Sequence, residues 1–174
     1  MAGTRKTVSR LRMPENTKKA EELCEGTDRF PITEESLSLC YEIITTTTNP
    51  LIWGELVHRI ADSPFSQDPA FRELLLDRLT DPGTKGARGV FLSALQKIGC
   101  KDSRSIKILC DEIQRGNFEC RYKSVQILKT AASALSVPQR KMLKRRLKRA
   151  HSEEVKLGRT METVLLALGE VFDE

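Results

Sequence analysis

The chain has 174 residues, of which 39% are hydrophobic and 30% charged, with a formal net charge of +5. This composition suits a single domain with a buried core and argues against a fully disordered chain. The five cysteines are widely spaced and form no paired Cys/His motif, which argues against both a disulfide-stapled mini-protein and a zinc site.

No apolar run is long enough to span a bilayer, and residues 1–14 lack the apolar centre of a secretion signal. We therefore expect no membrane insertion. The expected location is intracellular, in the cytoplasm, the nucleus or both, where the cysteines would be reduced thiols.

The positive charge is concentrated in two stretches. Residues 1–20 carry a net charge of +5, residues 21–136 of −3, residues 137–150 of +7 and residues 151–174 of −4. The first stretch has few apolar residues, so we expect residues 1–30 to form a basic, disordered N-terminal arm. The alternative is an arm that becomes ordered on an acidic partner, with Arg10 and Arg12 as its anchors.

From Thr33 onward, apolar residues recur at steps of three and four, which indicates helices throughout. Thr33 is expected to cap a first helix that ends within residues 45–49. Asn49 and Pro50 open a second helix, which residues 62–64 close. These two helices are predicted to form a divergent first pair within residues 31–66.

Three further helix pairs are predicted within residues 67–174, each with a polar turn between its helices. The predicted helices are residues 69–80 with 85–98, 103–115 with 119–135, and 138–150 with 155–172; Gly116-Asn117 form the second turn and residues 151–154 the third. Aligning Arg88 with Arg121 gives a period of 33 residues. A fixed period built from helix pairs is typical of stacked repeats, since one pair alone cannot bury its apolar face.

The segment LTDPGTKGARGVFLSALQKIG, residues 79–99, resembles a HEAT repeat. It has an Asp-Pro turn after the first helix, an arginine early in the second, and an Ala-Leu-x-x-Ile-Gly ending. The resemblance implies an all-α, short right-handed solenoid of about three to four helix pairs that serves as a protein-binding scaffold. It also implies that Asp81 and Arg88 help to link successive pairs. A compact six-helix bundle of the death-fold kind is the alternative fold.

The helix predicted over residues 137–150 carries the strongest surface signal. Leu143, Leu147 and Ala150 would pack inward, which leaves most of its cations exposed. One interpretation is a docking surface for an anionic partner; the other is a solvated helix whose charge the acidic residues 151–174 balance. The candidate binding residues on it are Arg140, Lys141, Lys144, Arg145, Arg146, Lys148 and Arg149.

The second helix of each pair usually lines the concave side of a repeat stack. Arg88, Arg121 and Lys123 are the leading partner-binding candidates on these helices. Other residues expected to point outward there are Gln96, Lys97, Gln126, Lys129, Arg159 and Glu162.

No set of residues points to catalysis. His58 and His151 have no neighbouring nucleophile arrangement, and residues 83–89 lack the spacing of a phosphate-binding loop. We expect no enzymatic activity, no cofactor and no metal. Cys110 is expected in the core, whereas Cys120, at a helix entrance before Arg121, is the thiol at which a thiolate would be favoured.

The sequence thus favours a non-enzymatic protein-binding scaffold or adaptor with a protein partner, and an acidic protein is one candidate for that partner. The alternative is a nucleic-acid-associated module that uses the basic helix 137–150 and the N-terminal arm. It ranks second because no aromatic residue lies in the basic helix to stack on bases. The apolar C-terminal end, residues 164–172, also suggests self-association.

Overall fold

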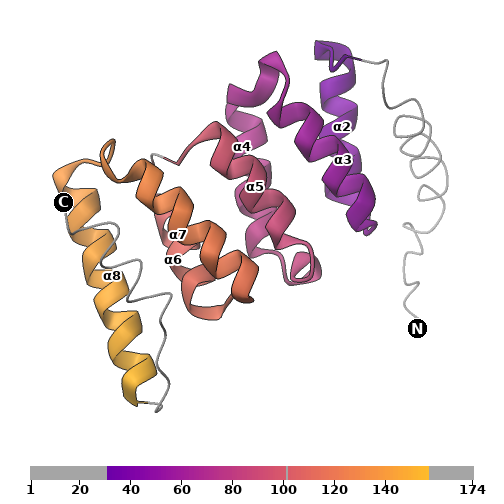
Figure 1. The fold of residues 1–174 in the computed structure, drawn as a ribbon. Coiled ribbons are helices and arrows are strands. Elements are labelled where there is room, and N and C mark those ends of the chain that lie inside the picture. The colour runs from indigo at the N-terminus through magenta and orange to yellow at the C-terminus, as the bar shows by residue number, and fades with distance from the viewer. Residues whose placement is uncertain (1–30, 101, 157–174) are drawn as a thin grey trace, which may run out of the picture. The chain divides into compact units, whose positions relative to one another are not determined.

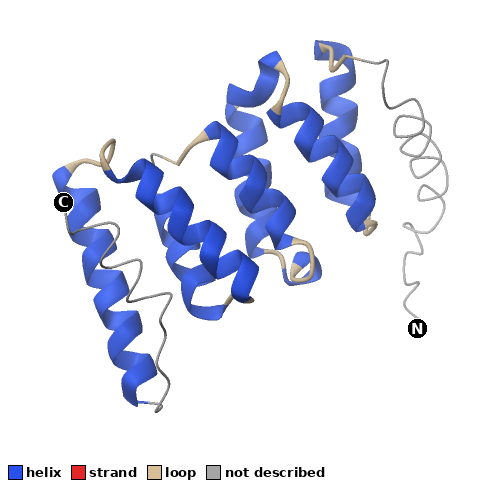
Figure 2. Ribbon diagram, in the orientation of Figure 1, coloured by secondary structure: helices blue, strands red, loops and turns tan. Residues whose placement is uncertain are grey.

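The computed structural model describes residues 31–100 and 102–156, and the regular structure within these ranges is helical, with no strand (Figures 1 and 2). The predicted all-α class is confirmed to that extent. The chain divides into two compact units, Met1–Phe65 and Ser66–Glu174. The expected basic arm, most of the helix predicted over 155–172 and the apolar end at 164–172 lie outside the described residues.

In the first unit, α2 (Glu34–Thr46) packs against α3 (Pro50–Ala61). Thr33 caps α2 by accepting a hydrogen bond from the Ser36 backbone, and Asn49 caps α3 in the same way from Leu51 N–H, as predicted. The hairpin closes over an apolar core that includes Trp53, whose Nε1 donates to the Ile44 carbonyl over 3.1 Å.

The second unit holds five α-helices and short 3₁₀ turns in the part of the chain that is described. Proline starts α4 after the cap Asp68, Asp102 caps α6, and Asn117 caps α7. Gly99 ends α5 with a φ of 83°, a conformation that favours glycine. The elements are η1 (Pro64–Gln67), α4 (Pro69–Thr80), η2 (Pro82–Thr84), α5 (Arg88–Ile98), α6 (Ser103–Arg115), α7 (Phe118–Ala132) and α8 (Val137–Lys156).

The helices of the second unit pack in two rows. Within pairs, α4 packs on α5 and α6 on α7. Between pairs, α4 contacts α6 and α6 contacts α8, while α5 contacts α7 (Figure 1). A Cβ at Gly89 of α5 would lie 2.7 Å from Oε1 of Glu119 on α7, so a side chain there would require the exposed Glu119 carboxylate to move.

Three predicted boundaries were wrong. Helix α7 ends at Ala132 rather than near Leu135. Helix α5 begins at Arg88 rather than Lys85, because residues 82–87 continue the turn that Asp81 starts by accepting from Gly83 N–H. The turn expected at residues 151–154 does not occur, and α8 continues through it to Lys156. No glycine or proline interrupts that stretch, and Arg149 pairs with Glu153 across it at 2.9 Å.

Candidate anion-binding surface

Helix α8 is held against α6 by one apolar seam. Leu143 and Leu147 are fully buried and Ala150 is 2% exposed, at a spacing of four and three residues. This is the seam that the sequence predicts. The seam fixes the orientation of α8 and leaves most of the residues between the seam positions exposed to solvent.

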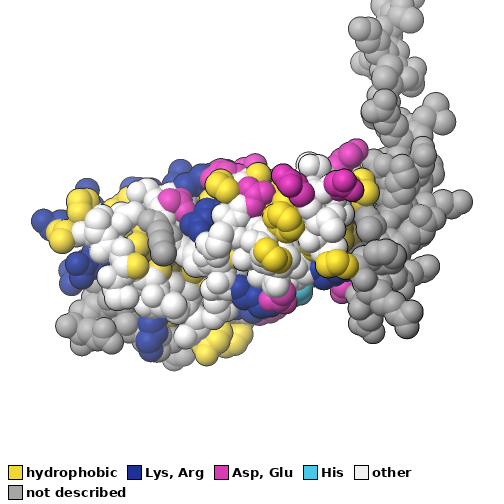
Figure 3. Space-filling model, turned by 90° about the horizontal axis from the view of Figure 1, so that it is seen from above, with side chains coloured by type: hydrophobic (Ala, Val, Ile, Leu, Met, Phe, Trp, Pro, Cys, Tyr) yellow, Lys and Arg dark blue, Asp and Glu magenta, His cyan; other side chains and the backbone are white. Residues whose placement is uncertain are grey.

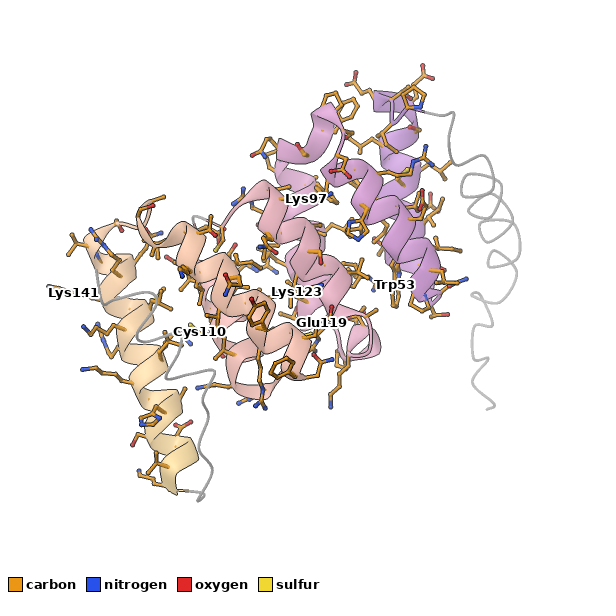
Figure 4. The ribbon with its side chains drawn as sticks, in the orientation of Figure 1. Trp53, Lys97, Cys110, Glu119, Lys123 and Lys141 are labelled. Carbon is orange, nitrogen blue, oxygen red and sulfur yellow. The ribbon has the colours of Figure 1, made fainter. Side chains whose placement is uncertain are left out.

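The cations of α8 lie on that outer side. Six of the seven predicted residues are exposed, and Arg146 is half-buried. In Figure 3, Lys and Arg side chains gather at the left, the side on which α8 lies in Figure 1. Lys141 extends from α8 away from α6 in Figure 4. The exposed cations are Arg140, Lys141, Lys144, Arg145, Lys148 and Arg149.

A cleft of about 460 Å³ lies between α6 and α8. Arg115 enters it from the last turn of α6, and three arginines of α8, Arg145, Arg146 and Arg149, line it from the other side. The carboxylates of Asp111 and Glu153 also line it. The sequence analysis missed Arg115. It placed residues 103–115 and 138–150 as first helices of adjacent pairs, but it did not identify which side chains of the two helices meet.

The three candidates on second helices lie in internal contacts instead. Arg88 Nη1 donates to Glu112 Oε1 over 2.6 Å and its side chain is 16% exposed. Arg121 Nε donates to the Gly116 carbonyl over 2.7 Å. These arginines hold their own pair or join it to the next one, so their outward orientation was predicted incorrectly.

Lys123 is held in the same way. Its Nζ donates to Ser93 Oγ over 2.7 Å and to the Gly89 carbonyl over 3.2 Å, so that it ties α7 to α5. It also pairs with Glu119 at 2.7 Å, and Figure 4 shows these two side chains together on α7. A lysine with these contacts would have to break them before it met a partner.

Asp81 and Arg104 show how neighbouring helices are joined by charge. Asp81, expected to link successive pairs, instead pairs with Arg78 within its own pair at 2.8 Å. Arg104 of α6 makes the link on the other row, because it pairs with both Glu73 and Asp77 of α4. The two pairs of Arg104 are exposed, so each adds little stability.

The cysteines of the described residues are buried, free thiols. Burial raises the pKa of Cys110 and of Cys100 to about 12. The pKa of Cys120 is also raised, first by burial and then by the nearby Glu112 and Glu119. The thiolate expected at Cys120 is therefore disfavoured, because these two carboxylates and burial outweigh the effect of the helix start.

The residues 31–100 and 102–156 hold no group of three or more His, Cys, Asp or Glu side chains that could bind a metal. In the same part of the chain, none of the helices combines the length and apolarity needed to cross a membrane. The search of protein-family models, of curated proteins and of solved structures found no match to this chain.

Proposed function

We propose that this protein is a non-enzymatic protein-binding module of the HEAT-repeat type, and that the basic face of α8 docks an acidic segment of a partner protein. The observation that carries the proposal is the orientation of α8. Three buried residues hold it on α6, and six cations point outward along one helix. Such a face attracts anions through the summed field of its charges.

The stacked-repeat part of the proposal rests on the packing of the second unit. Contacts of α4 with α6 and of α6 with α8 follow one row, and contacts of α5 with α7 follow the other. Arg88 bridges α5 to Glu112 on the next pair, which is the linking role that the HEAT resemblance implies for it. Among the described helices, the main contacts run between neighbouring pairs, which favours a repeat stack over a six-helix bundle.

The residues around the cations of α8 favour an acidic protein segment over nucleic acid as the ligand. The helix α8 contains no Phe, Tyr or Trp, and the exposed side chains of Phe118 and Tyr122 lie on α7. The basic residues of α8 therefore have no large aromatic side chain among them on which bases could stack.

The test measures binding of a fluorescein-labelled glutamate-rich peptide and of a labelled DNA duplex over a range of salt concentrations. The variant Lys141→Gln/Lys148→Gln removes two outward charges from α8. The matched control Lys85→Gln/Lys97→Gln removes two exposed charges elsewhere in the same unit. We expect the α8 variant to bind the peptide about tenfold more weakly, a loss of about 1.4 kcal/mol, and the control to match the unaltered protein.

Equal peptide binding by the α8 variant and the control would refute the proposal. Tighter binding of the duplex than of the peptide would support the nucleic-acid alternative. In that case the slope of log affinity against log salt should fall by about two in the α8 variant, one for each lost phosphate contact.

A further inference from the structure

The cleft between α6 and α8 differs in chemistry from the outer face of α8. Among the described residues, the cations that line the cleft are arginines: Arg115, Arg145, Arg146 and Arg149. The lysines Lys141, Lys144 and Lys148 are not part of its lining. Arginine offers a planar fork of N–H donors that fits carboxylate and phosphate oxygens two at a time, whereas lysine acts as a point charge.

Three of these arginines form no ion pair within the described residues. Arg149 Nε donates to Glu153 Oε1 over 2.9 Å. Arg115, Arg145 and Arg146 form no ion pair with any residue in the described part of the chain. The cleft thus brings together three guanidinium groups from two helices without an internal counter-ion for each of them.

The base of the cleft suits an anion that carries some apolar bulk. Cys110 is 3% exposed, and burial raises the pKa of its thiol to about 12, so it stays neutral. Met142, half-buried, adds a flexible apolar wall. Neither residue would repel an anion or react with it near neutral pH.

We infer that this cleft binds the phosphoryl group of a phosphorylated serine or threonine within the acidic segment that docks on α8. The inference rests on the proposed function and specifies its anchor. A phosphate monoester carries about 1.5 to 2 negative charges and three acceptor oxygens at neutral pH, which matches three unpaired guanidinium groups better than a single carboxylate does. Asp111 and Glu153 then accept hydrogen bonds from backbone N–H groups of the same segment.

The mixed lining distinguishes this ligand from a nucleic acid. A single phosphorylated side chain places one dianion among the arginines, and the peptide backbone beside it offers uncharged N–H donors to the two carboxylates. A nucleic-acid strand would bring further phosphates close to those carboxylates, at an electrostatic cost. The balance of charges in the cleft therefore favours the phosphorylated protein segment.

The experiment compares two synthetic peptides of one glutamate-rich sequence, with a central serine or a central phosphoserine, by calorimetric titration of the full chain. We expect the phosphopeptide to bind at least about tenfold more tightly. The variant Arg115→Gln/Arg145→Gln should lose this gain and bind both peptides alike. Arg115→Lys, which keeps the charge without the fork, should lose part of the gain.

The matched control is Lys141→Gln/Lys148→Gln on the outer face of α8. It should weaken both peptides by the same factor and leave their ratio unchanged. Circular dichroism of each variant checks that it folds, which we expect because Arg115, Arg145, Lys141 and Lys148 are exposed.

Each outcome has a distinct meaning. If the unaltered protein binds both peptides equally, or if the gain survives in Arg115→Gln/Arg145→Gln, the inference is overturned while docking on α8 stands. If neither peptide binds, the proposed function fails and the inference fails with it. If the cleft variant loses affinity for a DNA duplex as much as for the phosphopeptide, the cleft binds phosphate of nucleic acid and the inference is wrong.

Discussion

Glu112 is the only charged side chain that is buried in the described part of the chain, with 4% of its surface exposed. Its Oε1 accepts from Arg88, and its Oε2 has no hydrogen-bond partner. Burial raises the pKa of this carboxyl group, and the opposing effect of Arg88 does not fully cancel the increase. The link between α5 and α6 is therefore an ion pair that is incompletely compensated.

Glu112 should make the stability of the protein depend on pH in a direction opposite to that of most carboxylates. Because its pKa is raised in the folded state, its contribution is complete below its ordinary value of 4.5 and is lost as the pH rises through the folded value. The variant Glu112→Gln keeps an acceptor for Arg88 but cannot ionise. We expect urea unfolding to show Glu112→Gln gaining stability relative to the unaltered protein between about pH 4 and about pH 7.

The control is Glu55→Gln, which removes a half-buried carboxylate from the pair with Arg59. If the stability difference from the unaltered protein changed with pH in the same way for both Gln variants, the pH dependence could not be assigned to Glu112.

Residue by residue, sequence reasoning predicted the seam of α8 well and the second-helix cations poorly. Leu143 and Leu147 follow from the periodicity alone, since a helix repeats its face locally. The contacts of Arg88 and Lys123 are with residues of other helices, Glu112 and Ser93, which periodicity does not identify. Arg115 was missed for the same reason, because the cleft exists only once α6 and α8 meet.

At the scale of elements, helix starts were predicted where a local side chain makes them. Asn49, Asp68 and Asp102 each accept from a backbone N–H two or three residues on, a signal contained in a few neighbouring positions. The end of α8 was not predicted correctly. The 33-residue period required a turn there, but the residues supply no cap or breaker strong enough to stop the helix.

Continuity of α8 predicts a strong effect of proline at Ser152. In a helix interior, Ser152→Pro should cost about 3 kcal/mol, because it removes a hydrogen bond and clashes with the preceding turn. In a turn, the same change would be tolerated. We expect a clear drop in the unfolding midpoint for Ser152→Pro, while the control Ser152→Ala keeps or slightly raises it.

Amide hydrogen exchange would show which residues the Ser152→Pro substitution destabilises. The N–H groups of residues 153–156 should lose protection in Ser152→Pro, whereas those of α4 and α5 should keep it. Equal stability of the proline and alanine variants would mean that the chain turns at this point in solution.

For the molecule as a whole, the division into two units predicts that the second one folds by itself. The helices α4 to α8 contact one another within Ser66–Glu174, and their apolar core is continuous from Phe71 to Ala150. We expect a chain of residues 66–174 to be helical by circular dichroism and to unfold in one cooperative transition. A gradual, non-cooperative loss of signal would contradict this prediction.

Trp53, buried in the α2–α3 hairpin, is the single tryptophan of the chain. Its fluorescence therefore reports on the α2–α3 hairpin. Circular dichroism, in contrast, averages over the helices of both units. Recording the two signals on one unmodified sample shows whether the halves unfold together. Superimposable curves would mean one cooperative unit; separated curves would give the hairpin a transition of its own without any added dye.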